Sequence, residues 1–140
     1  NTPAAIAARY QIAYNHSNYD GRLGTLMAGF KAQNNDDFYT FSIYNAMVAL
    51  SHAMAKAKST DPVKVAAALD GLRFSGFNGD SEIRKSDHQV QQGLWISKWQ
   101  KVDAKNKYSL ENTGYTFAPV KYLDAYIAST PTSCQMKRPG

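Results

Sequence analysis

Residues 37–58 read DFYTFSIYNAMVALSHAMAKAK and contain the longest apolar-rich stretch of the chain. Apolar side chains recur there every three to four positions, a spacing that predicts one long helix. Asp37 stands at its positive end and Lys56 and Lys58 at its negative end, which suits the helix macrodipole. One apolar stripe consists of Ile43, Met47, Leu50, Met54 and Ala57, and a second consists of Phe41, Tyr44 and Val48. Because the first half is apolar nearly all round, we expect it to be buried on more than one face.

A second helix is predicted directly after this stretch. Ser59-Thr60-Asp61-Pro62 is a start signal, because Asp61 can accept hydrogen bonds from the first free amides and Pro62 suits the first helical position. We expect this helix to run from Pro62 to Asp70 and to end at Gly71. Its predicted buried side chains are Val63, Ala66, Ala67 and Leu69.

Upstream of the long helix, the sequence predicts a strand and a shorter helix. Residues 9–14 alternate in polarity and predict a short half-buried strand. The side chains that share one side of this strand are Tyr10, Ile12 and Tyr14. A cluster of turn-forming residues follows, and apolar side chains at helical spacing then predict a helix from Gly21 to Ala32. Asn18 or Asp20 is expected to cap its start.

Downstream of residue 72 the character of the chain changes. Residues 74–80 carry two glycines and are expected to form a loop or bulge. Residues 81–85 predict a short strand, and the alternation of residues 93–102 predicts a longer one. A short helix is expected over residues 119–128, followed by an extended tail over residues 129–140. The order of elements indicates an α/β or α+β mixture.

Length and composition set limits on the class of protein. The chain has 140 residues, which suits one domain with a core that needs no metal or disulfide. Hydrophobic residues make up 44% and charged residues 19%, which excludes collagen, coiled coil and wholesale disorder. No segment approaches the roughly 20 apolar residues of a membrane span. Cys134 is the one cysteine, so an internal disulfide and a multi-cysteine zinc site are excluded.

The net charge and the first residues bear on partners and processing. The formal net charge is +5, but the basic side chains are scattered, so we expect no nucleic-acid partner. The chain opens on Asn1-Thr2-Pro3 without the charged and apolar runs of a signal peptide. Either a signal peptide was removed or the chain is a piece of a longer protein.

No catalytic constellation is evident. Ser86-Asp87-His88 unites the residue types of a triad, but neighbouring residues point apart, and a triad is assembled from distant positions. A turn in which Asp87 accepts backbone amides is the simpler interpretation. His16 and His52 lack a second ligand at metal-site spacing. We therefore expect no catalytic residue, no metal and no cofactor.

Several short segments together resemble a known family. They are Ile43-Tyr44-Asn45-Ala46-Met47, Ser59-Thr60-Asp61-Pro62-Val63-Lys64-Val65, Phe74-Ser75-Gly76-Phe77-Asn78-Gly79, Ile83-Arg84-Lys85-Ser86-Asp87-His88-Gln89 and Pro131-Thr132-Ser133-Cys134-Gln135-Met136-Lys137-Arg138-Pro139. In order and spacing they resemble the C-terminal part of a type I periplasmic solute-binding protein. The resemblance is to the branched-chain amino-acid class that serves ABC transporters.

The resemblance implies a fold and a function. The implied fold is α/β, a C-terminal fragment of the type I periplasmic-binding-protein fold, with a hinge strand, helices, a β-hairpin and an extended tail in a single partial domain over residues 1–140. The implied function is that of a periplasmic solute-binding component of an ABC importer, without catalysis. Such a protein closes on a branched-chain amino acid or a related small ligand between two lobes and delivers it to a membrane permease.

The resemblance also implies ligand-binding residues. Tyr44 matches the family's tyrosine at the cleft-facing start of a long helix, where it packs on the ligand. Tyr14 and His16, at the end of the hinge strand, are further cleft candidates. Asn45 departs from the aspartate that is usual in the family, so the resemblance defines neither the hydrogen bonds at this position nor the identity of the ligand.

Other interpretations stay open beside this one. They are a ligand-sensing domain of the same fold, a truncated relative with a partner-binding role, and a hydrolytic enzyme built on Ser86 and His88. Cys134 could pair with a residue outside the chain in the periplasm. Because the family's N-terminal strands are absent, the helix over residues 37–58 lacks its usual partners. We therefore expect self-association, including a homodimer, and weak ligand binding by the chain alone.

Overall fold

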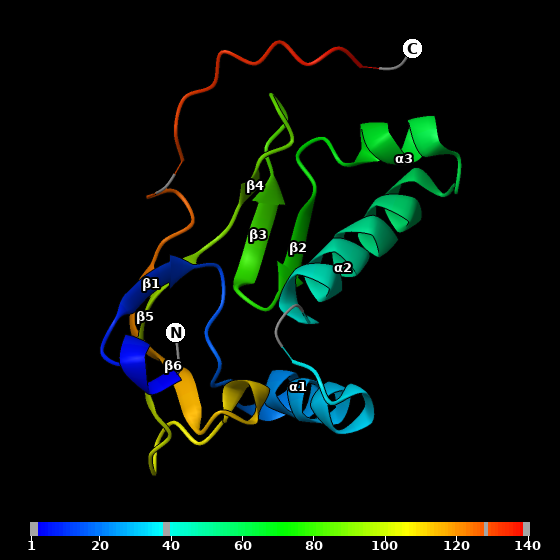
Figure 1. The fold of residues 1–140 in the computed structure, drawn as a ribbon. Coiled ribbons are helices and arrows are strands. Elements are labelled where there is room, and N and C mark those ends of the chain that lie inside the picture. The colour runs from blue at the N-terminus through cyan, green and yellow to red at the C-terminus, as the bar shows by residue number, and fades with distance from the viewer. Residues whose placement is uncertain (1–2, 38–39, 128, 139–140) are drawn as a thin grey trace. The chain divides into compact units, whose positions relative to one another are not determined.

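The computed structural model describes residues 3–37, 40–127 and 129–138. The chain forms two compact units, each built from two separate segments. The first unit comprises residues 1–41 and 94–123, and the second comprises residues 42–93 and 124–140. Helices and antiparallel strands make up both units (Figure 1). The expected mixed α/β character is confirmed, whereas the single partial domain stays a prediction.

The first unit is organised around a three-stranded antiparallel sheet in the order β1-β5-β6. Its strands are β1 (Tyr10–Ala13), β5 (Leu94–Lys101) and β6 (Tyr115–Leu123). Ile12 pairs with Ile96, and Trp99 pairs with Phe117. The register shifts between Ile96 and Ser97. Helix α1 (Gly21–Asn34) and two 3-10 turns, η1 (Pro3–Ile6) and η2 (Leu110–Asn112), complete the unit.

Strand β1 forms where the alternation predicted it, but its apolar side is open. Tyr10 is 62% exposed and Ile12 is 63% exposed. No described segment covers these two side chains on their face of the sheet. The expected half-burial through Tyr10 and Ile12 is therefore wrong.

The capping prediction for α1 is confirmed in position but not in its hydrogen bond. Asp20 occupies the N-cap position, but its side chain makes no capping hydrogen bond. The side-chain amide of Asn18 instead donates from Nδ2 to Thr116 Oγ1 at 2.9 Å and to the Phe117 carbonyl at 3.2 Å. Asn18 thus ties the loop before α1 to β6 rather than starting the helix. At the other end, Asn35 adopts a left-handed conformation with φ 49°.

The second unit packs two helices with a three-stranded antiparallel sheet. Its elements are α2 (Thr40–Ala57), which starts at the end of the first unit, α3 (Pro62–Ala68), β2 (Arg73–Gly76), β3 (Gly79–Ile83) and β4 (Val90–Gln91), and the strand order is β2-β3-β4. The buried core consists of Ala49, Ala53, Val65, Ala68, Leu72, Phe74 and Ile83. Small side chains on the helices let them lie close to the sheet.

Helix α2 spans Thr40–Ala57, and Asp37 lies outside it, while Phe38 and Tyr39 of the predicted helix lie outside the described residues. Its described side chains bury one narrow line of residues. Asn45, Ala49 and Ala53 are buried at a spacing of four. Ile43 is 65% exposed and Met47 is 59% exposed, so the expected burial on more than one face is wrong. The core buries the small side chains of the helix, and Val48 and Met54 pack against it half-buried, whereas Ile43, Met47 and Leu50 stay exposed. The side chain of Phe41 lies outside the described residues.

The start signal of α3 is confirmed. The Lys64 amide donates to Asp61 Oδ1 at 3.0 Å, and Pro62 takes the first helical position. The helix ends at Ala68, earlier than expected. Its buried side chains are Val65 and Ala68, whereas Val63 is 41% exposed. Of the predicted buried set, Leu69 is half-buried and packs against the core, whereas Val63 and Ala67 are exposed, so the predicted set is wrong in part.

Residues 74–80 form most of a hairpin rather than a loop. Strands β2 and β3 pair in register, with Phe74 opposite Ser81 and Gly76 opposite Gly79. Phe77 and Asn78 form the turn, and Gly79 has φ 72°, a conformation that favours glycine. The glycines that suggested a loop instead permit a tight turn between strands.

The short helix expected over residues 119–128 is not present over residues 119–127, because residues 115–123 form β6, and Ala128 lies outside the described residues. Pro119 is tolerated because β6 is an edge strand and the register shifts beside it. Residues 129–138 have no helix or strand, as expected for the tail. Residues 139–140 of that prediction lie outside the described residues.

Candidate functional site

Tyr44 lies in the first turns of α2 and belongs to the second unit. Its ring meets the Phe77 ring edge-on, with centroids 4.9 Å apart and an interplanar angle of 79°. The neighbouring Asn45 is buried, and its Oδ1 accepts a hydrogen bond from the Phe77 amide at 2.9 Å. The helix and the β2–β3 turn therefore hold Tyr44 from two sides.

Tyr14 and His16 lie close together in the first unit, directly after β1. His16 is 5% exposed and stacks on Tyr19, with ring centroids 4.0 Å apart. The Trp95 ring meets His16 edge-on at 4.7 Å. The Trp95 indole N–H is buried and has no acceptor among the residues that the structure describes. Tyr44 belongs to the second unit, whereas Tyr14 and His16 belong to the first.

Burial keeps His16 neutral. Loss of solvation lowers the pKa of His16 from 6.5 to about 4, against a small opposing effect of the Asp20 charge. The backbone N–H of Asn18 donates to His16 Nδ1 at 3.0 Å, so in the neutral ring the proton lies on Nε2. Burial also raises the pKa of Tyr19. This aromatic cluster is therefore uncharged at neutral pH.

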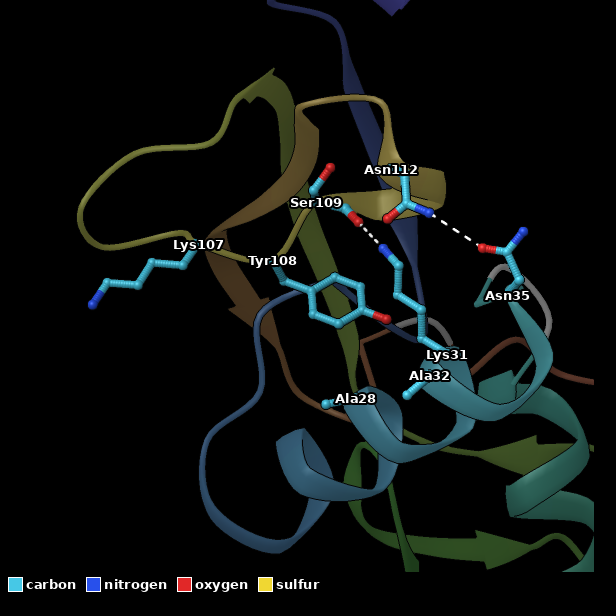
Figure 2. Close-up of a pocket in the computed structure, with 8 residues that line it drawn as sticks. All are labelled: Ala28, Lys31, Ala32, Asn35, Lys107, Tyr108, Ser109 and Asn112. Atoms are coloured by element: carbon cyan, nitrogen blue, oxygen red, sulfur yellow. Dashed lines mark hydrogen bonds between the residues drawn. The ribbon is translucent and has the colours of Figure 1, made fainter.

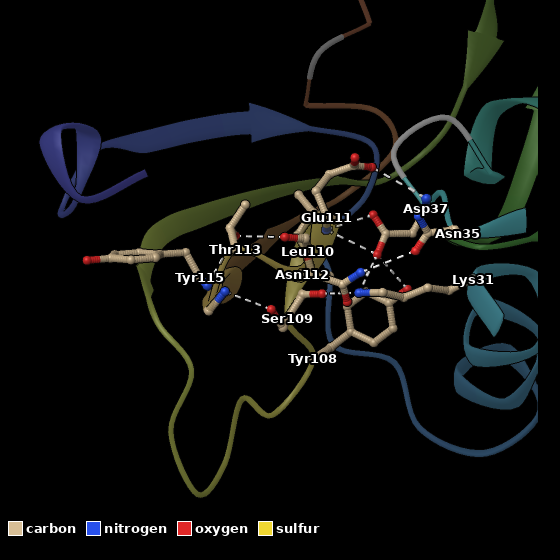
Figure 3. A network of polar contacts seen from close by, with 12 residues as sticks. Lys31, Asn35, Asp37, Tyr108, Ser109, Leu110, Glu111, Asn112, Thr113 and Tyr115 are labelled. Carbon is tan, nitrogen blue, oxygen red and sulfur yellow. Dashed lines mark hydrogen bonds and ion pairs between the residues drawn. The ribbon is translucent and has the colours of Figure 1, made fainter. Parts of the chain in front are cut away.

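A polar network that the sequence did not reveal is centred on Asp37, which is 1% exposed (Figure 3). Its carboxylate accepts from Lys31 Nζ at 2.9 Å, from Tyr108 Oη at 3.1 Å and from the Glu111 amide at 3.0 Å. Lys31 Nζ also donates to the Ser109 carbonyl. The network ties the end of α1 to the segment that leads into η2.

The charges of this network shift each other's protonation. Burial alone would raise the pKa of Asp37, but the Lys31 ammonium and the hydrogen bonds from Glu111 and Tyr108 hold it below its usual range. The side chain of Asp37 raises the pKa of the Glu111 carboxyl. The sequence pattern around Asp37 indicated only a favourable charge at a helix start, because two of its partners, Tyr108 and Glu111, are more than seventy positions away.

Beside this network lies an open pocket of about 460 Å³ (Figure 2). It is lined by Ala28, Lys31, Ala32, Asn35, Lys107, Tyr108, Ser109 and Asn112. Asn112 Nδ2 donates to Asn35 Oδ1 at 3.5 Å, and Lys107 points away from the other lining residues. Because Asp37 already balances the Lys31 charge, the pocket offers an anion little net attraction.

The residues of the Ser86-Asp87-His88 segment serve a turn rather than a triad. The Gln89 amide donates to Asp87 Oδ1 at 3.1 Å, as expected for a turn. Arg84 pairs with Asp87 and lowers its pKa. His88 Nε2 lies 2.5 Å from Asp70 Oδ1 rather than beside a serine. The hydrolytic interpretation thus finds no nucleophile and base in contact among the described residues of this segment.

The same turn holds the C-terminal tail of the second unit. Arg84 Nη1 donates to the Thr130 carbonyl at 2.7 Å. Arg138 pairs with Asp70 through two contacts of 2.8 and 3.2 Å and donates to the Lys85 carbonyl. Cys134, between these attachments, is exposed and free. Its pairing with a residue outside the chain stays a prediction.

Among the described residues, no three His, Cys, Asp or Glu side chains gather as metal ligands would. No helix in the described parts of the chain is long and apolar enough to cross a membrane.

The sequence matches the family model described as periplasmic binding protein over residues 8–106, more than half of the chain. The chain therefore belongs to the periplasmic binding protein family. A comparison with curated proteins found no match.

Solved structures agree with this family. The chain is similar to an ABC-type branched-chain amino acid transporter protein from Rhodopseudomonas palustris, with 26% identity and a TM-score of 0.70, covering 93% of this chain and 36% of that one. A leucine-, isoleucine-, valine-, threonine- and alanine-binding protein from Brucella ovis, in its closed conformation, shares 18% identity with a TM-score of 0.79, covering 97% and 36%. A solute-binding protein from R. palustris, in complex with 3,4-dihydroxybenzoic acid, shares 17% identity with a TM-score of 0.70, covering 86% and 32%.

These matches confirm the expected family and the expected fold, the C-terminal portion of a type I periplasmic binding protein. The chain spans about a third of the length of the structures it matches. Two of these relatives are described by aliphatic or other small amino acids, and the third is in complex with an aromatic acid.

Proposed function

We propose that this chain is part of the solute-binding component of an ABC importer, which binds a branched-chain amino acid or a related small ligand between two lobes. The similarity to the branched-chain amino acid transporter protein, across 93% of the chain, carries this proposal. The protein acts in the periplasm without catalysis and passes its ligand to a membrane permease. The alternatives of a ligand-sensing domain and of a partner-binding relative share the same fold.

In this proposal Tyr44, Tyr14 and His16 contact the ligand. Tyr44 packs its ring on the ligand, supported by its position at the start of α2 and its half-buried ring. His16 is supported by its burial and its fixed neutral form. A neutral imidazole can donate from Nε2 to a ligand oxygen without the cost of burying a charge.

A second ligand class is an aromatic acid. The cluster of His16, Tyr19 and Trp95 favours it, because flat aromatic rings pack well on one another. The relative in complex with 3,4-dihydroxybenzoic acid shares the fold.

Ligand-observed NMR on the 140-residue chain tests both classes, since it detects binding as weak as a Kd of about 1 mM, or about 4 kcal/mol. The panel is leucine, valine and 4-hydroxybenzoate, with lysine as a control of different chemistry. We expect saturation transfer to the members of one class and a reduced signal for Tyr44→Ala. Tyr126→Ala, which removes a tyrosine that is 62% exposed, is the matched control. Equal transfer to lysine, or an unchanged signal for Tyr44→Ala, contradicts the proposal.

A further inference from the structure

Asn45 makes a buried contact that joins two elements far apart in the sequence. Its Oδ1 accepts from the Phe77 amide at 2.9 Å, across 32 positions of the chain. Asn45 is 9% exposed and Phe77 is 3% exposed, so water cannot replace this bond. An N–H donor requires an acceptor, so the amide oxygen rather than the nitrogen faces Phe77. The bond therefore fixes both the Asn45 amide and the start of the β2–β3 turn.

Gly76 shows how closely the turn fits this amide. A Cβ at Gly76 would lie 2.2 Å from Asn45 Oδ1 and 2.9 Å from its Cγ. Such distances are far inside van der Waals contact, and even alanine would force the amide or the turn to move. The fit between Asn45 and the turn thus depends on a glycine at position 76.

Phe77 carries this fixed geometry to Tyr44. The Phe77 ring meets the Tyr44 ring edge-on, an arrangement that is favourable beyond simple burial. The backbone of Phe77 is held by Asn45, and Asn45 follows Tyr44 directly on α2. Loss of the amide acceptor would break the buried hydrogen bond that holds the Phe77 backbone, so the turn would shift and the Phe77 ring with it.

We infer that Asn45 is a positioning residue that fixes the β2–β3 turn and, through Phe77, the ring of Tyr44. Its effect on ligand binding rests on the proposed function, whereas its effect on the Tyr44 ring does not. An aspartate can serve the same bond, because a carboxylate oxygen also accepts. The uncharged asparagine achieves this without a buried charge.

Asn45→Leu tests the inference, because leucine is similar in size and cannot accept a hydrogen bond. The measurement is NMR of the chain with labelled tyrosine and phenylalanine, with the Tyr44 signals assigned through Tyr44→Phe. We expect Asn45→Leu to abolish the ring-current shift of the Tyr44 protons and the slow exchange of the Phe77 amide. Asn45→Asp, made separately, should retain both the ring-current shift and the slow exchange. Ser51→Ala, which removes an exposed side-chain bond on the same helix, should change neither.

A second variant guards against loss of folding. Gly76→Ala keeps both hydrogen-bonding partners but separates them, and we expect it to shift the Tyr44 signals in the same way. Unchanged Tyr44 shifts in Asn45→Leu with a protected Phe77 amide, or in Gly76→Ala, would overturn the inference. So would a loss of shift in Asn45→Asp as large as in Asn45→Leu.

The ligand arm separates this inference from the proposed function. Where a ligand binds, we expect Asn45→Leu to raise its Kd about tenfold, the effect of losing one buried hydrogen bond. If no ligand perturbs Tyr44 in the unmodified chain while Asn45→Leu still abolishes its ring-current shift, the proposed role of Tyr44 fails and the positioning role stands. If a ligand perturbs Tyr44 and Asn45→Leu changes nothing, the positioning role fails alone.

Discussion

Asp37 is a buried carboxylate in the first unit. The carboxylate has four hydrogen-bonding contacts with Lys31, Tyr108 and the Glu111 amide. A buried carboxylate is tolerated only when it is paired and hydrogen-bonded. Removal of its charge leaves Lys31 without its partner in a site where water cannot compensate fully.

Asp37→Asn should therefore lower the free energy of unfolding by about 3 kcal/mol at neutral pH. The folded pKa of Asp37 lies below its ordinary value of 3.8, so its stabilisation is present above that value and is lost as the pH falls through the folded pKa. Urea unfolding at several pH values measures both effects. Asp36→Asn removes the same charge from an exposed neighbour and should cost much less. Equal losses for the two variants would contradict the assignment.

His16 makes stability depend on pH in a different window. Its folded pKa of about 4 lies below its ordinary value of 6.5, so its unfolded form binds the proton more tightly. The free energy of unfolding should fall by up to about 3 kcal/mol as the pH drops from 6.5 to about 4. His16→Asn keeps an acceptor for the Asn18 amide and should remove this dependence. His52→Asn, at an exposed histidine, should leave it intact, and a dependence that persists without His16 would refute the explanation.

At the scale of elements, the tail is attached by charged side chains rather than by an apolar core. Arg138 pairs with Asp70, and Arg84 reaches the Thr130 carbonyl. Most of residues 130–138 are exposed, so these contacts are open to screening by salt.

Arg138→Gln should therefore release the end of the tail without unfolding the second unit. Heteronuclear NOE values for residues 131–138 should fall, and they should fall in the unmodified chain as the salt concentration rises. Signals of the buried Ala53 and Ile83 should stay unchanged in both cases. Arg73→Gln on β2, which removes an exposed pairing with Glu82 on β3, serves as the control. A tail that stays as ordered in Arg138→Gln as before would contradict this attachment.

The open stripe of α2 belongs to the same scale. Ile43, Met47 and Leu50 present exposed apolar side chains, and exposed patches of this kind favour association. The predicted self-association is tested by sedimentation velocity over a range of concentrations. We expect the apparent mass to rise with concentration and Met47→Lys to suppress the rise. Monomeric behaviour throughout would count against the prediction.

Across the whole molecule, features that depend on local sequence could be predicted, whereas features that depend on contacts between distant segments could not. Asp61 and Pro62 located the start of α3, and the alternation of residues 93–102 located β5, because both signals lie within the element itself. Strand β6 was read in part as a helix, since Pro119 and its neighbours form a strand only when β5 pairs with them. Burial on α2 depends on which face the core meets, and the periodicity of the sequence does not contain that choice.

In the candidate site, too, one part could be predicted from the sequence and another part could not. Tyr44 could be proposed from a family motif, but its support by Asn45 and Phe77 needed the fold, because the two partners are 32 positions apart. The Asp37 network was missed for the same reason. Single polar residues far apart in a sequence carry no pattern that would predict their contact.

Chemical-shift mapping with a bound ligand tests the central claim most directly. The labelled chain is titrated with leucine and, separately, with 4-hydroxybenzoate. We predict that one of them perturbs the signals of Tyr44, Tyr14 and His16 and leaves those of Lys31, Tyr108 and Asn112 unchanged. Perturbations that gather at the pocket beside α1 instead, or that are absent for both ligands, would contradict the assignment of these three residues to ligand binding.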